Sequence, residues 1–478
     1  MGEFRFRLPD DWMLASRQAS SIHVVGLDGI PWPCRVFTEG KTLVIRRNRD
    51  ESGKIYIAYP FERYGEFTIC TGSLPERSES YDLLTELARG TLNRLRNQIS
   101  NWKEGGLSIS EEVTETTSEA ISLLGKSILA SDHGAKDQHA REAVAKAFDI
   151  VFLLSRQFGD QVSRFRVDHA DFSQFWIGAA ASDSLEFESS ANQVGFELVQ
   201  LKPENLNPIQ LSSIENQPNP KRMIVGPFLD ASAGGLDEEL IRMDDFEQRK
   251  RRILSDCRTA IENLPESTSL LHVVSGLNGL GHRHLGYPQQ LQLAIDMLHL
   301  IEESSCEVPN LISFDFPWAE RLASSVGGIH PLQIADTLLR QGLGVSFLGL
   351  DINLDYWPGG SVVRDPLQWI DMIDIWSQLG LPLVICFRIP IGNATSPASD
   401  PNRIVSEVRS NLSDQVRLDL LETIVPMMIA RPSVHGMIFR QWCDSDDLRF
   451  PNGGLAKDDG SRKAIVDLLI DLRDRYLS

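Results

Sequence analysis

The first part of the chain alternates apolar and polar positions over short stretches. The stretches SIHVVGL, TLVIRR, KIYIAYPF and EFTICTG show this pattern between residues 4 and 72. Asp-Gly, Glu-Gly and Ser-Gly pairs, which favour tight turns, separate the stretches. A period of two places the apolar side chains on one face of a strand. The pattern therefore predicts a small antiparallel β domain over residues 1–75.

A helical pattern follows over residues 76–168. Apolar residues recur there at three- and four-residue spacing in SYDLLTELARGTLNRLRNQISNWKEGG, SEEVTETTSEAISLLGKSILA and DQHAREAVAKAFDIVFLLSRQF. This spacing lines one face of an α-helix with apolar side chains. The sequence predicts a helical segment between the β domain and the rest of the chain.

Short apolar runs alternate with amphipathic stretches over residues 169–478. The runs are FWIGAAA, GFELVQL, RMIVGPF, LLHVVSGL, PNLISFDF, VSFLGLDIN, PLVICFRIP and VHGMIFRQW. Strands that alternate with helices form parallel α/β folds, and runs in this number suit a closed barrel better than an open sheet. The predicted fold is an α/β protein with a (β/α)8 TIM barrel over residues 169–478.

One connection in the barrel segment shows clear helix signals. Asp365 can cap a helix, Pro366 occupies the first helical position, and Gly380 can end the helix before the next strand. Apolar residues recur three apart between these points. The stretch predicts a helix between two strands.

The charge balance bears on the partners of the protein. The chain has 66 acidic and 47 basic residues, which gives a net charge of −19. Nucleic acids and anionic membranes attract cationic surfaces. Neither is expected as a partner.

The sequence shows no pattern typical of disulfides, of a leader segment or of a metal site. The six cysteines are scattered without a CxxC pair, which predicts free thiols in a reducing compartment. The first residues, MGEFRFRLPDDW, contain no apolar leader segment, and we expect a cytoplasmic protein. His282 and His284 form a His-x-His pair without a third ligand nearby, so we predict no metal and no cofactor.

Polar residues close the later apolar runs, where a barrel carries its chemistry. These residues are Asp315, Trp318 and Glu320 after one run, Asp351, Asn353 and Asp355 after the next, then Arg388, and finally Gln441, Trp442 and Asp444. Carboxyl groups can move protons or accept hydrogen bonds from hydroxyl groups, and indole rings stack on sugar faces. Such a set suits a sugar site, although each acid could instead cap a helix or pair with an arginine.

The closing stretch, GMIFRQWCDSDDLRFPNGGLAKDDGSRKAIVDLL, resembles the last segment of glycoside hydrolase family 10, the xylanase family. Three upstream stretches, TLLRQGLGVSFLGLDINL, LGLPLVICFRIP and FWIGAAA, look like motifs of the same family in the same order. The stretch LKPENLNP resembles its opening Glu-Asn motif, so the resemblance assigns Glu204 and Asn205 to sugar binding. It implies a TIM barrel that acts on a β-linked glycan.

The chain departs from the family at the catalytic positions. The nucleophilic glutamate of the family corresponds to Phe387, and the acid/base glutamate corresponds to Gly276. A lysine and a histidine of the family correspond to Pro208 and Pro227. Neither phenylalanine nor glycine can act as a nucleophile or move a proton. Hydrolysis would therefore require a relocated pair of carboxyl groups.

Two hypotheses follow. In the first, the barrel binds and hydrolyses an oligo- or polysaccharide with relocated acids drawn from Asp315, Glu320 and Asp351. The expected sugar-binding residues are Glu204, Asn205, Trp318, Asn353, Trp357, Trp442 and Asp444. A retaining or an inverting mechanism is compatible with this hypothesis, and the β domain would resemble a carbohydrate-binding module.

In the second hypothesis, the barrel is catalytically inactive and serves as a glycan-binding or protein-interaction scaffold. The helical segment would then be its docking surface. The two hypotheses differ in geometry, because hydrolysis needs a carboxyl pair that faces an open groove, whereas a scaffold would hold these acids in ion pairs or helix caps.

Overall fold

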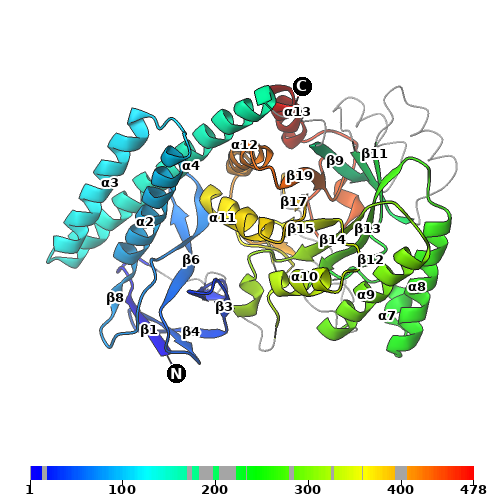
Figure 1. Cartoon of the computed structure of the whole chain (residues 1–478). Helices are drawn as coiled ribbons and strands as arrows, with labels where there is room; N and C mark the ends of the chain where they lie inside the picture. The colour runs from blue at the N-terminus through cyan, green and yellow to red at the C-terminus, as the bar shows by residue number, and fades with distance from the viewer. Residues whose placement is uncertain are drawn as a thin grey trace.

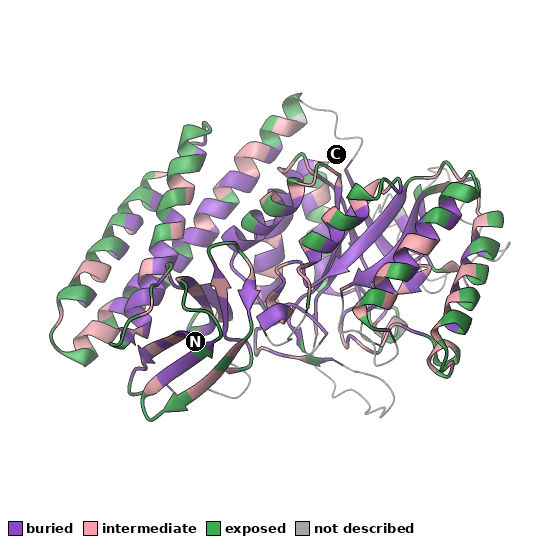
Figure 2. Ribbon diagram, turned by 60° about the horizontal axis from the view of Figure 1, so that its bottom comes forward, coloured by how far each residue is buried: buried purple, intermediate pink, exposed green. Residues whose placement is uncertain are grey.

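The computed structural model describes residues 2–12, 19–169, 175–181, 198–203, 222–232, 234–278, 285–323, 328–357, 359–392 and 406–477. Two β-sheets and three helices form the N-terminal part, which lies beside a barrel of parallel strands (Figure 1). Figure 2 shows that the barrel strands are buried and that its helices expose their outer faces. The order of β domain, helical segment and barrel is the one predicted.

The barrel contains eight parallel strands in a closed ring. They are β9 (Trp176–Ala181), β10 (Leu198–Leu201), β11 (Arg222–Val225), β13 (Thr268–Leu277), β14 (Asn310–Asp315), β15 (Phe347–Asn353), β17 (Leu383–Arg388) and β19 (Val434–Phe439). The ring runs β11-β10-β9-β19-β17-β15-β14-β13 and closes through the pairing of β11 with β13. A short strand, β12 (Leu229–Asp230), pairs with the end of β13. Each ring strand coincides with one predicted apolar run, so the barrel prediction is confirmed.

Helices alternate with these strands on the outside of the ring (Figure 1). They are α7 (Glu238–Ile241), α8 (Phe246–Glu262), α9 (Tyr287–Glu303), α10 (Pro331–Arg340), α11 (Pro366–Ser377), α12 (Asp414–Ile429) and α13 (Ala464–Tyr476), with the 3-10 turns η3 (Glu320–Ala323) and η4 (Asp444–Asp446). As predicted, Pro366 begins α11, and the side chain of Asp365 caps it by accepting a hydrogen bond from the backbone N–H of Gln368. Gly380, at a φ of +75°, follows its end.

The N-terminal β domain consists of two four-stranded sheets. One contains β1 (Gly2–Arg7), β4 (Cys34–Glu39), β5 (Thr42–Arg47) and β8 (Tyr81–Asp82), and the other β2 (His23–Gly26), β3 (Pro31–Trp32), β6 (Gly53–Phe61) and β7 (Gly65–Cys70). All pairings are antiparallel except that of β8 with β1. Along β1 the buried side chains alternate with partly exposed ones, as the period-two pattern requires. The antiparallel β prediction is confirmed.

Three helices link the β domain to the barrel: α2 (Leu83–Glu104), α3 (Glu111–Leu129) and α4 (His133–His169). The long helix α4 packs along α12 of the barrel (Figure 1). Arg156 on α4 donates to the hydroxyl group of Thr423 at 3.1 Å, and Ser163 donates to the backbone carbonyl of Pro426 at 3.0 Å. One face of the helical segment is therefore already occupied by the barrel.

The β domain itself docks on the loop that connects β15 to α11. The backbone N–H of Thr68 donates to the carbonyl of Val363 at 2.7 Å, and the amide of Gln368 donates to the carbonyl of Thr68 at 2.7 Å. Strands β2 and β3 lie against η3, which follows β14. The β domain thus covers part of the barrel face at which the strands end.

Two smaller expectations also concern the fold. None of the helices in the described ranges is long and apolar enough to cross a membrane. The cysteines at positions 34, 70, 257, 306, 386 and 443 are all free thiols, as expected.

Candidate functional site

Two of the predicted catalytic acids lie side by side at the strand ends. Asp315 on β14 and Asp351 on β15 are direct partners in the register of the two strands. The Oδ2 atom of Asp351 accepts hydrogen bonds from the backbone N–H of Gly276 at 2.8 Å and from the hydroxyl group of Ser313. The expected juxtaposition of two carboxyl groups on neighbouring strands is therefore present, with one of them held by fixed donors.

A buried relay of hydrogen bonds orients Asp351. Arg440 and Gln200 donate to Nδ1 of His272 at 3.0 and 2.9 Å, so the ring proton lies on Nε2. Nε2 in turn lies 2.9 Å from the hydroxyl oxygen of Ser313, which donates to Asp351. Burial, followed by the charge of Arg440, lowers the pKa of His272 to about 3 and keeps the ring neutral. Protein groups alone therefore hold the carboxylate of Asp351 in place.

Asp315 has a different environment. Its Oδ1 atom accepts hydrogen bonds from the amide of Asn353 and from the backbone N–H of Phe316, both at 3.2 Å. Burial, followed by repulsion from Asp351, raises the pKa of Asp315 well above its usual range. Glycosidases likewise use a carboxyl group with a raised pKa beside a second carboxyl group. Asp315 and Asp351 are only 2% and 3% exposed, however.

Ion pairs fill the rest of the barrel end. Arg449 contacts Asp230 at 2.9 Å and Asp447 at 2.6 Å, and Arg388 contacts Asp447 at 3.1 Å. Arg388 also donates a hydrogen bond at 2.9 Å to the side-chain oxygen of Asn353. This bond engages the amide that the sequence predicted to bind sugar. These side chains pair with one another at the ends of the barrel strands, where a barrel enzyme binds its substrate.

Gly276 and Phe387, which the motif resemblance led us to expect in place of two glutamates, are tightly packed. Gly276 has a φ of +64°, and a Cβ atom at this position would lie 2.7 Å from the Cβ atom of Ser232. Phe387 is fully buried, and its ring stacks with the rings of Trp369 and Phe439 at centroid distances of 5.7 Å. Both residues are thus part of the local packing.

The neutral Asp315 leads to a prediction about stability. Because its folded pKa is raised, the unfolded chain releases the proton above pH 3.8 while the folded chain retains it, and this difference opposes folding increasingly as the pH rises. Asp315→Asn keeps an acceptor for Asn353 and removes this cost. We expect its free energy of unfolding at pH 7 to exceed that of the unsubstituted protein by about 1–2 kcal/mol.

Urea denaturation at pH 7 and at pH 4.5 checks this prediction. The gain should shrink at the lower pH, and Asp351→Asn should instead destabilise the protein because it weakens the hydrogen bonds from Gly276 and Ser313. A less stable Asp315→Asn variant would contradict it.

A cavity of about 490 Å³ lies between the β domain and the barrel. The β domain and the segment before it contribute Ala19, Ser20, Ser21, Ile22, His23, Cys34 and Val36, and the barrel loops contribute Phe316, Glu320, Arg321, Ala323, Trp357, Gly360, Val362 and Arg409. The barrel residues come from the loops that follow β14, β15 and β17. This volume is within the range of roughly 300–1,000 Å³ typical of small-ligand sites.

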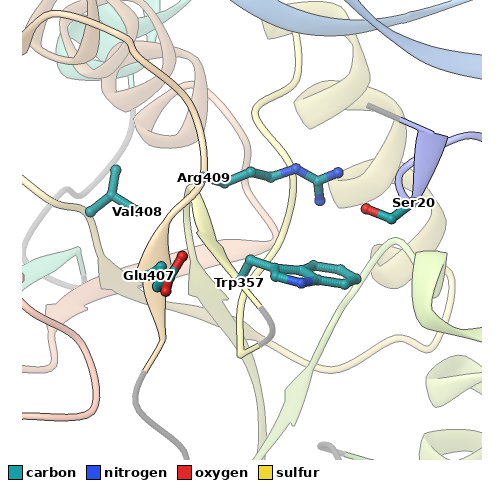
Figure 3. A pocket seen from close by; sticks show the side chains of 5 residues that line it. All are labelled: Ser20, Trp357, Glu407, Val408 and Arg409. Carbon is teal, nitrogen blue, oxygen red and sulfur yellow. The ribbon is translucent and has the colours of Figure 1, made fainter. Parts of the chain in front are cut away.

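A short two-stranded sheet positions the indole of this cavity. Strand β16 (Tyr356–Trp357) pairs with β18 (Glu407–Val408), with Trp357 directly opposite Glu407. Arg409 follows β18, and its guanidinium lies over the Trp357 ring at 5.0 Å from the centroid. Figure 3 shows the two side chains extending together toward Ser20, beside a small adjoining hollow. Trp357 is 41% exposed, which is unusual for an indole and suits a stacking platform.

Glu320 is the predicted acid that reaches the cavity wall. Its carboxylate lies 4.0 Å from the guanidinium of Arg364, and neither carboxylate oxygen has a hydrogen-bond partner among the described residues. Arg364 is fixed behind the wall: it lies 5.2 Å from the ring centroid of Trp318 and donates to Gln368 at 2.8 Å. The wall therefore contains a partly buried acid with a cation nearby.

The other predicted residues within the described ranges do not line the cavity. Trp318 is half-buried and donates to the backbone carbonyl of Gln368 at 3.2 Å, and Trp442 is buried in the core. Asp444 pairs with Lys463 at 2.5 Å and accepts a hydrogen bond from Gly454, so it shapes the C-terminal loop. The positions Glu204, Asn205, Pro208, His282 and His284 lie outside the described residues.

Sequence reasoning missed the contribution of the β domain to this cavity. His23 lies on β2, and Ser20 and Ser21 precede it, far in sequence from any barrel strand. Arg409 follows a two-residue strand that carries no apolar run of its own. Only the docking of the two parts brings these residues together.

The chain is similar in structure to solved xylanases. Xylanase 10B from Thermotoga maritima is 11% identical, with a TM-score of 0.44 over 67% of this chain and 98% of that chain. A psychrophilic glycoside hydrolase family 10 endo-β-1,4-xylanase is 11% identical, with a TM-score of 0.42 over 65% and 99%. The endo-1,4-β-xylanase XylE of Penicillium canescens is 12% identical, with a TM-score of 0.42 over 65% and 97%.

No protein-family model matches the chain, and no curated protein sequence matches it. The assignment of the barrel rests on its own strand order, and at these identities no residue role passes from the xylanases to this chain. The described part of the protein is thus a closed (β/α)8 barrel whose ligand-sized cavity is completed by an N-terminal β domain.

Proposed function

We propose that this protein binds a short β-linked glycan in the cavity between its β domain and its barrel and does not hydrolyse it. One observation carries the proposal: among the described residues that line the cavity, Glu320 alone has a carboxyl group. Retaining and inverting glycosidases both use two. The other acid of this region, Glu407, lines only the adjoining hollow, whose volume of about 20 Å³ holds little more than one water molecule.

The cavity has the mixed surface that a sugar requires. Trp357 and Phe316 offer apolar faces for the C–H groups of a pyranose ring, and Ser20, Ser21 and Arg409 offer polar groups for its hydroxyls. A hydroxyl group can both donate and accept, so it can serve a carboxylate and a guanidinium at once. The β linkage of the ligand is inferred from the motif resemblance alone.

The acids outside the cavity support binding without cleavage. Asp351 is held by backbone and hydroxyl donors, and Asp315 is closed in beside it. Neither lines the cavity. A scaffold is expected to hold its strand-end acids in this way, whereas an enzyme exposes them to its substrate.

Binding and hydrolysis can be tested on the same protein. We expect no release of nitrophenol from nitrophenyl β-xyloside or β-glucoside and no cleavage of soluble xylan, but measurable binding of xylotriose or cellotriose by calorimetry. Trp357→Ala should weaken binding about tenfold or more because it removes the stacking platform. The control is Phe165→Ala, which removes a more exposed ring on α4, 62% exposed, away from the cavity and should leave the affinity unchanged.

A second candidate function is hydrolysis by Asp315 and Asp351, which their adjacency and the raised pKa of Asp315 favour. The same assays separate the two. If the unsubstituted protein cleaves a substrate and Asp315→Asn and Asp351→Asn both abolish cleavage, the barrel is an enzyme with a relocated site. If it neither cleaves nor binds any of these sugars, the glycan proposal fails.

A further inference from the structure

The carboxylate of Glu320 lacks a hydrogen-bond donor. The side chain lines the cavity and is 10% exposed. Both carboxylate oxygens are buried, and neither accepts a hydrogen bond from any described residue. The guanidinium of Arg364 lies 4.0 Å away, which is too far for a hydrogen bond. Because a buried carboxylate without donors is unfavourable, Glu320 is an acceptor that the described part of the chain leaves unsatisfied.

Other contacts hold Arg364 in its place. Its Nη1 atom donates to the side-chain oxygen of Gln368 at 2.8 Å. Its guanidinium lies 5.3 Å from the ring centroid of Tyr56 and 5.2 Å from that of Trp318. The residue is 2% exposed, so it cannot move toward Glu320 without disturbing this packing. The cavity is therefore the side from which a donor can approach Glu320.

The backbone that carries Glu320 is fixed in a strained shape. Phe316 and Ala319 have φ angles of +51° and +58°, in the left-handed region that residues with a side chain rarely adopt. The indole of Trp376 donates to the carbonyl of Pro317 at 3.0 Å, and strands β2 and β3 lie against η3, which Glu320 begins. Strain of this kind is common where a loop aims a side chain at a ligand. With the backbone held, the side chain of Glu320 is the part of this loop that is left to turn.

We propose that Glu320 turns into the cavity when the glycan binds and accepts hydrogen bonds from two neighbouring hydroxyl groups of one sugar residue. The inference rests on the proposed glycan binding and specifies the side chain that recognises the hydroxyls. A carboxylate has two acceptor oxygens and no donor, so it matches a pair of hydroxyl donors. The guanidinium of Arg364 repels a cation at this place, so the expected ligand is a neutral sugar with free hydroxyl groups and not an amino sugar.

Glu320→Gln separates recognition of a ligand from a structural role. The amide keeps the shape of the carboxylate but has one acceptor oxygen and no charge. We expect calorimetry to show about tenfold weaker binding of xylotriose, because hydrogen bonds to a charged acceptor are the stronger ones. The free variant should unfold at the same or a higher temperature, since it no longer buries a carboxylate without donors. A lower unfolding temperature with unchanged affinity would mean that Glu320 only offsets Arg364, and would overturn the inference.

Methyl β-xyloside and its 2-, 3- and 4-deoxy forms test the same contact from the side of the sugar. In NMR titrations, two deoxy forms that lack adjacent hydroxyl groups should bind the unsubstituted protein about tenfold more weakly than the parent. Against Glu320→Gln, these two forms and the parent should bind nearly alike, because their hydroxyl groups have lost the carboxylate. Trp357→Ala should instead weaken the parent and the deoxy forms by a similar factor. Should Glu320→Gln fail to fold, Glu320→Asp replaces it, since the shorter side chain draws the carboxylate back from the sugar.

Glu302→Gln is the matched control, because this glutamate on α9 is 70% exposed and does not line the cavity. It should change neither the affinity nor the unfolding temperature. If the deoxy forms lose as much affinity for Glu320→Gln as for the unsubstituted protein, the hydroxyl groups contact another side chain, and the inference fails while glycan binding stands. If the unsubstituted protein binds neither the xyloside nor the oligosaccharides, both proposals fail.

Discussion

Arg449→Met is expected to lower the free energy of unfolding by about 3 kcal/mol, because it leaves the largely buried carboxylate of Asp230 without its ion-pair partner. Arg449 contacts Asp230 on β12 and Asp447 after η4, at 2.9 and 2.6 Å. Asp447 keeps a second partner in Arg388, whereas the described structure shows no other ion pair for Asp230. The loss should therefore fall mainly on Asp230 and on the end of the barrel between β12 and β13.

The pH dependence of this loss follows from the carboxyl groups. Burial alone would raise the pKa of Asp447, but Arg449 and Arg388 hold it at about 2, and arginines likewise hold the pKa of Asp230 below its usual range. Such groups stabilise the fold above their unfolded pKa of 3.8, and this contribution is lost as the pH falls toward the folded value. The difference between Arg449→Met and the unsubstituted protein should be largest near pH 7 and should shrink below pH 4.

Urea denaturation at pH 7 and pH 3.5 measures both effects. Arg242→Met is the control, because this arginine is 78% exposed and pairs only within one turn of α7. It should change stability by less than about 0.5 kcal/mol. An Arg449→Met variant as stable as the control would show that the ion pairs at the barrel end contribute nothing to the fold.

Much of the architecture could be predicted because it depends on local patterns. Each barrel strand is buried on both faces and therefore appears in the sequence as a continuous apolar run, as in LVICFR of β17. The start of α11 was predictable from Asp365 and Pro366, since capping is decided by neighbours in the sequence. The adjacency of Asp315 and Asp351 followed from their places at the ends of consecutive strands.

The candidate site was less predictable because its residues meet only through docking. Trp442 looked like a rim residue, yet its ring turns into the core, and a one-residue change in where a strand ends decides between the two directions. The motif resemblance led us to expect Gly276 and Phe387 in place of two glutamates, but only the structure shows how closely Ser232 approaches Gly276 and how the ring of Phe387 stacks on Trp369. Nothing in the sequence of the β domain indicated that His23 and Arg409 share a cavity.

The contact that fixes the β domain and helices on the barrel gives the second large prediction. Asp365 is completely buried. Its carboxylate accepts hydrogen bonds from both Nη atoms of Arg94 on α2, at 3.2 and 2.5 Å. It also accepts hydrogen bonds from the backbone and the amide of Gln368, which in turn binds Thr68 of the β domain. One carboxylate thus caps α11, pairs with α2 and orients the side chain that holds the β domain.

Asp365→Ala should therefore cost about 3–5 kcal/mol of unfolding free energy, since it removes a helix cap and leaves the largely buried Arg94 without its ion-pair partner. The double variant Arg94→Met/Asp365→Ala should be less destabilised than the sum of the single variants, because the stranded cation is gone. Asp336→Ala, at an exposed aspartate on α10, is the control and should be nearly neutral. Because the cavity lies between the parts that Asp365 joins, the single variant should also bind the glycan more weakly at temperatures at which it remains folded. Unchanged affinity in a clearly destabilised Asp365→Ala protein would mean that the barrel loops alone, and not their docking with the β domain, form the site.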